Sequence, residues 1–182
     1  MKRLLSAAVA LAGIAFSFDY YTSARQKVDL IESGNLRPGA RIDLSIGELN
    51  AFAAREAPAG IREAKLVLES QERVSGSALV DFNKLRRAQG YEPGWLMSRL
   101  LDGEHPVSAT AIIRSGGGKV RVDVTRVSIS GVEIDGRTLD FIIQNFVLPF
   151  YPDAMVGRDV PMGFRIERLQ LAPAGVGVWI GR

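Results

Sequence analysis

Two long segments in the C-terminal half alternate apolar and polar residues, and each breaks its alternation at one point. In residues 119–130, apolar side chains share one face up to Val124 and reappear one residue out of phase at Val127. In residues 163–171, the same break precedes Leu169. A one-residue shift moves every following side chain to the other face of a sheet, so each break predicts a β-bulge that bends its strand. We therefore expect a curved sheet.

An unusually apolar segment, residues 139–148, lies between these two strands. It follows the turn Asp135-Gly136 and is ended by Pro149. Its apolar residues recur at steps of three and four, which predicts a helix with a broad apolar stripe. Phe141 and Leu148 widen this stripe beyond what one packing face needs. The sheet is thus expected to curve around something apolar, and the residues leave open whether that is only its own core.

The remaining segments predict an α+β domain with a long, curved, mainly antiparallel sheet and helices on its concave side. Further strands are expected over residues 40–46, 61–70, 74–84, 107–114 and 176–180. Further helices are expected over residues 46–56 and 93–101. The first of these helices begins at Ser45-Ile-Gly-Glu48, which has the spacing of a capping box. In the strand over 74–84, Gly76 and Ala78 are small, so a side chain or ligand can approach that face closely.

The N-terminal residues, 1–24, indicate a signal peptide or an N-terminal anchor. Lys2-Arg3 precedes an uncharged apolar run that is shorter than the roughly 20 residues of a membrane-spanning helix. Thr22-Ser-Ala24 offers small residues for cleavage before Arg25. Residues 25–39 are expected to be a linker, and residues 40–182 a single domain. We expect an exported protein of the bacterial periplasm or cell envelope, with cleavage and retention as an anchor both open.

Composition argues against catalysis and against nucleic acid as a partner. The chain has no cysteine and one histidine, so a thiol nucleophile, a disulfide and a two-histidine zinc motif are excluded. That histidine, His105, follows Asp102 and Glu104 in a segment that is more typical of a solvated turn than of a metal or acid–base site. The 23 basic residues are interspersed with 20 acidic ones. The candidate basic patches alternate with acidic residues, and no aromatic residues interleave with them as a surface for base stacking. These patches are Arg86-Arg87 and the set Arg121, Arg126, Arg165 and Arg168. We expect neither an enzyme nor a metal or cofactor.

The C-terminal half resembles the bacterial LmeA-like proteins of the tubular lipid-binding (TULIP) superfamily. The resemblance lies in the order of Val120–Ile134, a turn, an apolar helix, a Pro-containing loop, the strand Phe164–Leu171 and a short last strand. The opening segment Ile42–Asn50, a strand followed by Ser-x-x-Glu-Leu-Asn, resembles that family as well. The likeness covers most of Ala40–Ile180 and contains no catalytic signature.

This resemblance implies a TULIP-like fold, in which the sheet wraps around apolar helices and an apolar groove holds acyl chains without a cofactor. The expected partner is a phospholipid or similar amphiphile, with binding or transfer at the cell envelope and contact with a membrane surface. The implied groove residues, for each of which an ordinary core position stays open, are Leu139, Ile142, Ile143, Phe146, Val122, Val124, Ile166 and Leu169.

Two questions stay open at this point. Arg137 and Arg99 are candidates for attracting an anionic headgroup at the mouth of the groove. The alternative function is a structural or adaptor domain of the envelope that docks another, unnamed protein through its apolar surface. A filled core with one flat exposed apolar patch would favour this alternative, and a continuous groove would favour lipid.

Overall fold

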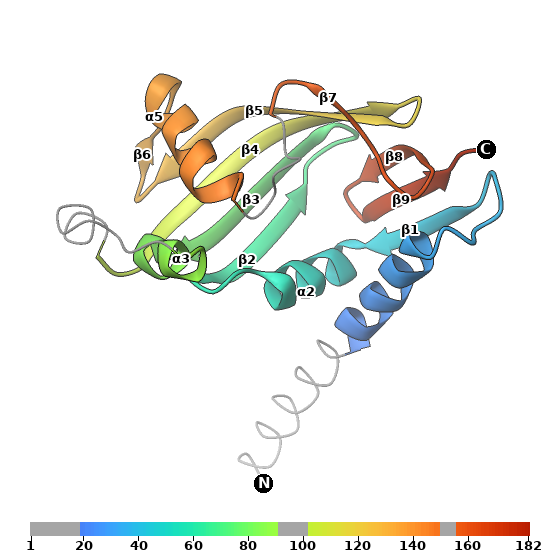
Figure 1. Ribbon diagram of the computed structural model, residues 1–182, viewed down its shortest axis with the longest axis horizontal. Coiled ribbons are helices and arrows are strands. Elements are labelled where there is room, and N and C mark those ends of the chain that lie inside the picture. Colours follow the sequence, from blue (N-terminus) through green and yellow to red (C-terminus); the bar gives the residue numbers. More distant parts are fainter. Residues whose placement is uncertain (1–18, 91–101, 150–155) are drawn as a thin grey trace, which may run out of the picture.

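The computed structural model describes residues 19–90, 102–149 and 156–182, and it shows an α+β fold (Figure 1). The strands are β1 (Arg41–Ser45), β2 (Ile61–Leu68), β3 (Arg73–Val80), β4 (His105–Gly116), β5 (Lys119–Ile129), β6 (Val132–Glu133), β7 (Asp159–Pro161), β8 (Ile166–Ala172) and β9 (Gly175–Ile180). The helices are one over residues 19–32, α2 (Ile46–Glu56), α3 (Phe82–Ala88), α5 (Gly136–Ile142) and the π-helical η1 (Ile143–Val147). The helix expected over residues 93–101 lies outside the described residues.

The strands form two sheets, and every strand pairing is antiparallel. One sheet has the order β1-β9-β8, and the other has the order β2-β3-β4-β5-β6, with β7 also paired to β5. An isolated parallel bridge joins Val122 to Val156. The mainly antiparallel α+β prediction is confirmed, but the single long sheet is divided, because β8 and β9 pair with β1 instead of continuing from β5.

Both predicted bulges are present in the structure. Ala111 pairs with Val124 and Thr110 pairs with Arg126, which leaves Thr125 as the extra residue of β5. The second register shift lies between Ile166 and Arg168 in β8. In β5 the extra residue returns Val127 to the face of Val124, so the apolar face continues through the bend.

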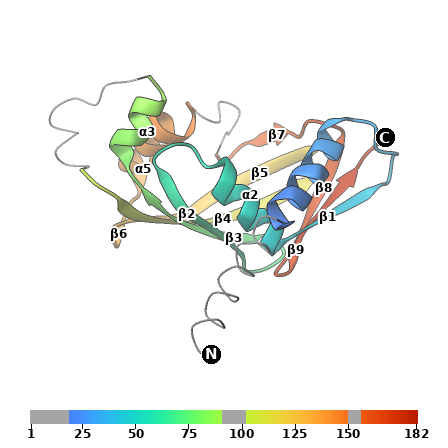
Figure 2. The ribbon, with the colours of Figure 1, turned by 90° about the horizontal axis from the view of Figure 1, so that it is seen from below.

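The strand registers place only Gly, Ala, Val, Leu and Ile on one face of the strands β2 to β5 over most of their length. These residues are Ile61, Ala64, Leu66, Leu68, Val74, Gly76, Ala78, Val80, Val107, Ala109, Ala111, Ile113, Val120, Val122, Val124, Val127 and Ile129. Hydroxyl and charged side chains dominate the opposite face, among them Ser77, Ser108 and Ser128. Figure 2 shows the sheet as a curved layer with the helices on one side of it.

Local capping explains where two of the helices begin. Ser45 caps α2, with its hydroxyl accepting from Glu48 N and the Glu48 side chain accepting from Ser45 N, so the predicted capping box is confirmed. The strand expected to reach residue 84 ends instead at Val80. Asp81 accepts a hydrogen bond from Lys84 N at 2.9 Å and starts α3, a side-chain cap that competes with strand continuation.

Residues 25–39 are not the linker that the polar composition predicts. A helix covers residues 19–32, and Ala24 and Ile31 are buried against Leu44, Val178 and Ile180. These two apolar residues are two helical turns apart, so they lie on the same face of the helix, which packs against the three-stranded sheet. The proposed cleavage point before Arg25 lies inside this helix. Within the described residues, no helix combines the length and the hydropathy that crossing a bilayer requires.

Candidate functional site: an apolar hollow between two core clusters

Most of the buried apolar side chains among the described residues form two separate clusters at opposite ends of the molecule. The first joins the helix over 19–32 to the three-stranded sheet through Ala24, Ile31, Leu44, Val178 and Ile180. The second joins α3 and η1 to the far ends of the long strands through Val80, Phe82, Leu85 and Phe146. A small domain ordinarily has one contiguous core. The division into two clusters therefore raises the question of what covers the apolar face in the middle of the long sheet.

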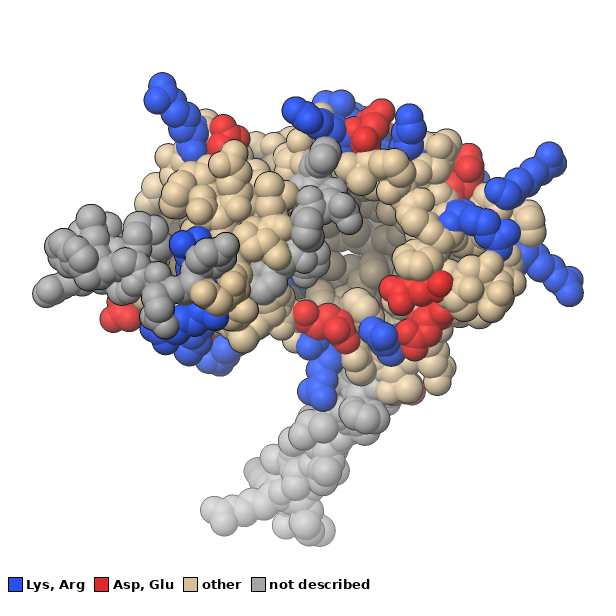
Figure 3. Space-filling model, viewed as in Figure 1, with Lys and Arg blue, Asp and Glu red and all other residues tan. Residues whose placement is uncertain are grey.

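The middle of the apolar sheet face belongs to neither cluster. Leu68 and Val127 on this face are buried, whereas the rest of its middle is only partly buried. The partly buried residues are Leu66, Val74, Gly76, Ala109, Ala111, Ile113, Val122 and Val124. Figure 3 shows a hollow at the centre of the molecule, between the ends that hold the two clusters, with charged side chains along its lower rim. The described part of the structure thus leaves an apolar surface open between two packed ends.

Small side chains explain why the middle of this face is hollow. Gly76 pairs with Ala109, and Ala111 lies two residues farther along the same strand. A Cβ atom added at Gly76 would meet only Leu66 Cδ2 at 3.5 Å and the Lys65 carbonyl oxygen at 3.8 Å, both ordinary contacts. A Cβ atom at Gly76 would therefore be accommodated without a clash.

Two side chains connect the walls of this hollow. Each of them binds both the N–H and the carbonyl group of one residue in another element, as a neighbouring strand would. Ser115 Oγ of β4 accepts from Leu169 N of β8 at 2.8 Å and donates to the Leu169 carbonyl oxygen at 3.0 Å. Asn50 of α2 accepts from Leu66 N at 2.6 Å and donates to the Leu66 carbonyl oxygen at 3.1 Å. These bonds tie the three-stranded sheet and α2 to the long sheet without continuing the strand ladder between them.

The helix on the other wall changes its geometry where it enters the second cluster. From Ile143 it is a π-helix, in which Leu148 N donates to the Ile143 carbonyl oxygen at 3.0 Å. The ring of Phe146 packs edge-on against Phe82 at 5.1 Å and lies 6.5 Å from Phe141. A period of 3.6 residues cannot reveal this insertion, and π-turns of this kind are frequent at functional sites.

The structure distributes the eight expected groove residues over three environments. Phe146 and Ile142 pack in the second cluster, and Ile166 and Leu169 pack against the first. Val122 and Val124 lie on the floor of the hollow. Leu139 and Ile143 are half-buried and belong to neither cluster.

The floor residues Gly76, Ala109 and Ala111 were not among the predicted groove positions. Their small size was visible in the sequence, but the face they share became evident only from the register.

Of the two expected headgroup residues, Arg137 is exposed at the start of α5. Within the described residues it forms no ion pair. Arg99 lies outside the described residues.

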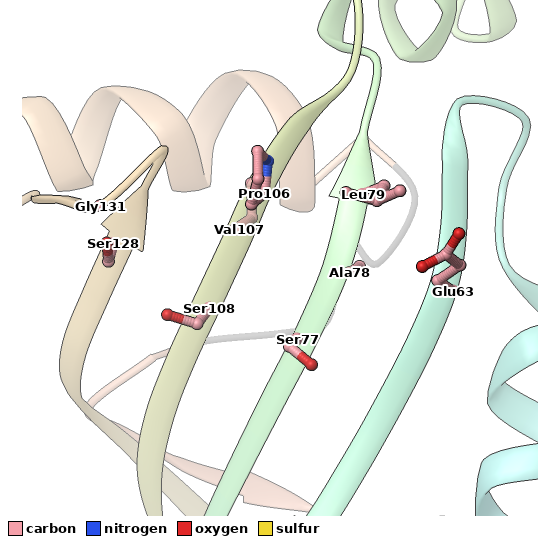
Figure 4. A pocket seen from close by; sticks show the side chains of 9 residues that line it. All are labelled: Glu63, Ser77, Ala78, Leu79, Pro106, Val107, Ser108, Ser128 and Gly131. Carbon is pink, nitrogen blue, oxygen red and sulfur yellow. The ribbon is translucent and has the colours of Figure 1, made fainter.

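The opposite, polar face of the long sheet carries a shallow pocket of about 340 Å³ (Figure 4). The hydroxyls of Ser77, Ser108 and Ser128 from three neighbouring strands line it together with Glu63. No histidine or second carboxylate lines this pocket to act with Glu63 as a proton-transfer pair.

His105, Glu104 and Asp102 do not form a joint site. His105 Nδ1 lies 3.1 Å from Ser130 Oγ, whereas Glu104 is bound to Arg62 at 3.0 Å. Across the described ranges, no three His, Asp or Glu side chains group as metal ligands would.

Glu48 is the most strongly perturbed acid among the described residues. It is buried, and its carboxylate accepts from Ser23 Oγ at 2.5 Å, Lys27 Nζ at 2.9 Å and Ser45 N at 2.7 Å. Burial raises the pKa of Glu48, but the bonds from Lys27, Ser23 and Ser45 outweigh burial and lower the pKa from 4.5 to about 2. This network docks the helix over 19–32 on α2.

We expect the free energy of unfolding to fall as this network is protonated. The pKa of Glu48 is lower in the folded state than in the unfolded state, so its stabilisation is complete above pH 4.5 and is lost as the pH falls towards about 2. The linkage amounts to about 3 kcal/mol. Urea unfolding of the protein and of Glu48→Gln should differ by about this amount at pH 7 and converge near pH 2. A difference that does not change with pH would contradict the assignment.

Comparison with known proteins gives no further guidance: no protein-family model, no curated protein and no solved structure matches the chain.

Proposed function

We propose that this protein binds a phospholipid or similar amphiphile at the bacterial cell envelope, without catalysing a reaction. The observation that carries the proposal is the apolar middle of the long sheet, which remains partly exposed between two separate core clusters. Binding sites for apolar ligands are concave, mostly apolar cavities with preformed walls. An acyl chain lying on this face would complete a core that the protein side chains leave unfinished.

Burial of methylene groups supplies enough free energy for this mode of binding. Each buried methylene contributes about 0.8 kcal/mol, so eight of them contribute about 6 kcal/mol before the cost of association. No polar recognition residue is needed for such affinity, which agrees with a floor made only of Gly, Ala, Val, Leu and Ile. Transfer between membranes is the corresponding cellular role.

The wrapped, TULIP-like architecture is part of the same proposal. The bulges at Thr125 and in β8 support it, because they bend the strands. The helices support it because α3 and η1 pack at one end of the apolar sheet face, whereas α2 binds the backbone of Leu66 on the edge strand β2.

A protein-docking role is the second candidate, and a different surface favours it. Val132 of β6 is 63% exposed and Phe141 of α5 is 47% exposed. These elements are close in the chain and adjacent in Figure 1. Exposed apolar side chains that gather in this way are typical of interaction surfaces.

Native mass spectrometry with lipid extraction tests the lipid proposal on full-length protein purified from the envelope fraction. We expect near-stoichiometric phospholipid on the unaltered protein and a clear reduction in Ile143→Glu, because a charge beside the hollow opposes an acyl chain. Gln144→Glu is the matched control, since it adds the same charge at the exposed neighbouring position. An apo mass that takes up no added lipid would reject the lipid proposal and leave the docking role.

A further inference from the structure

Three loops meet at the end of the molecule that holds the three-stranded sheet, and we call residues 33–37, 117–119 and 162–165 the tip. Gly118 N donates to the Glu167 carbonyl oxygen at 3.0 Å, and Met162 N donates to the Gly118 carbonyl oxygen at 2.8 Å. The Arg165 guanidinium donates to the carbonyl oxygens of Gly34 and Leu36 at 2.5 and 2.6 Å. These bonds join the three loops into one surface.

An aromatic side chain is held outward on this surface at an energetic cost. Phe164 is 51% exposed, and both Phe164 and Arg165 have left-handed backbone angles, with φ of 54° and 57°. Residues with a Cβ atom avoid this conformation, which persists only where the surrounding structure enforces it. Here the bonds from Arg165 enforce it. Strain that displays an apolar ring to solvent points to a function for that ring.

The tip carries three basic residues, and the exposed acidic residues Glu32 and Glu167 flank it in the sequence. The tip contains Arg37, Lys119 and Arg165 and no Asp or Glu. Among the described residues these three form no ion pair. Figure 3 shows several Lys and Arg side chains extending from this end of the molecule. An exposed aromatic ring surrounded by unpaired cations matches the apolar and anionic layers of a bilayer surface.

The other exposed apolar surface does not share this pattern. Phe141 and Val132 lie near Glu133, Asp135 and Asp140. Arg137 is also in that part of the sequence, and Arg126 forms an ion pair with Glu133 at 3.4 Å. Acidic neighbours repel an anionic bilayer, so charge distinguishes the two ends.

We propose that the tip docks on anionic phospholipid bilayers, with Phe164 inserted at the interface and Arg37 and Lys119 facing the headgroups, while Arg165 holds the loops of the tip together. This inference deepens the proposed lipid-binding function, because it names the surface through which the protein meets the membrane. It rests on described residues alone.

The absence of cysteine allows a local test on the full-length chain. Gly163→Cys places a single label beside Phe164, where an added Cβ atom has no neighbour within 4 Å. An environment-sensitive fluorophore at residue 163 should shift to the blue with phosphatidylcholine vesicles containing phosphatidylglycerol, and respond little to phosphatidylcholine alone. Ser108→Cys, exposed on the polar sheet face, is the labelled control.

Two further changes identify the groups responsible. On the Gly163→Cys background, the anionic-lipid signal should fall at least about five-fold in Arg37→Glu/Lys119→Glu, since each basic residue near a surface contributes about that factor. Phe164→Gly should lower the signal without lowering the melting temperature, because glycine adopts this φ without strain. The proposal would be overturned if the emission of the label at residue 163 did not shift with anionic vesicles. An equal shift in the variants, or an equal shift of the label at residue 108, would overturn it as well.

The proposed lipid groove and the proposed membrane-docking tip can be rejected independently of each other. Phe164→Gly should still carry phospholipid in native mass spectrometry, because Phe164 is not on the floor of the hollow. Loss of co-purified lipid without loss of the label shift would reject the groove alone. The reverse result would reject the tip alone.

Discussion

Gly76→Phe should abolish lipid uptake while leaving the protein folded. Gly76 lies on the floor of the hollow, and an added Cβ atom there meets only ordinary contacts. An aromatic ring would occupy the space proposed for the acyl chain and would gain burial of its own. We expect phospholipid binding, measured by native mass spectrometry after incubation with lipid, to fall at least about ten-fold, the equivalent of displacing only two methylenes.

Ser77→Phe is the matched control for this experiment. Ser77 is the next residue of β3 and lies on the opposite, polar face of the sheet, where it pairs with Ser108. The same ring added there leaves the hollow unchanged, so lipid binding should persist. Equal loss of lipid in both variants would mean that β3 itself is disturbed, and retention of lipid in Gly76→Phe would place the lipid elsewhere.

Phe146→Ala should be among the most destabilising single substitutions in the described part of the chain. Phe146 is 7% exposed and is one of only four buried residues of the second cluster, where it packs edge-on against Phe82. Removing a buried phenyl ring costs about 3–5 kcal/mol, a large part of the stability of a domain of this size. Because η1 and α3 meet through this ring, both helices should loosen from the sheet.

Urea unfolding followed by circular dichroism measures this change, and Phe141→Ala provides the comparison. Phe141 lies five residues earlier in the same helical segment and is 47% exposed, so its loss should cost less than about 1 kcal/mol. A similar cost for the two substitutions would contradict the central position of Phe146 in this cluster.

Features that depend only on residues close together in the chain could be predicted from the sequence alone. The bulge at Thr125 follows from the phase break between Val124 and Val127, and the capping box at Ser45 follows from the spacing of a hydroxyl and a carboxylate. The two glycines of the β4–β5 turn have φ of 59° and 73°, as a two-residue hairpin requires. Each of these features is decided within a few residues of the chain.

Which residues form the candidate site was decided by the tertiary structure. Ile142 and Ile143 are equally apolar neighbours, yet only Ile142 packs in the second cluster, because consecutive helical residues point in different directions and the packing of α3 decides which of them is covered. The docking of the helix over 19–32 likewise depends on Glu48, which lies 25 residues after Ser23.

The division of the sheet and the hollow depends on pairings between distant segments. Ser115 binds the backbone of Leu169 across 54 residues, in a place where strand pairing could have continued. Gly76 and Ala109 are small residues in separate strands, and only their pairing places them side by side on one face of the sheet. Periodicity reports which face of an element is apolar. Whether that face is buried depends on which side chains from distant elements pack against it. A local sequence pattern does not record these contacts.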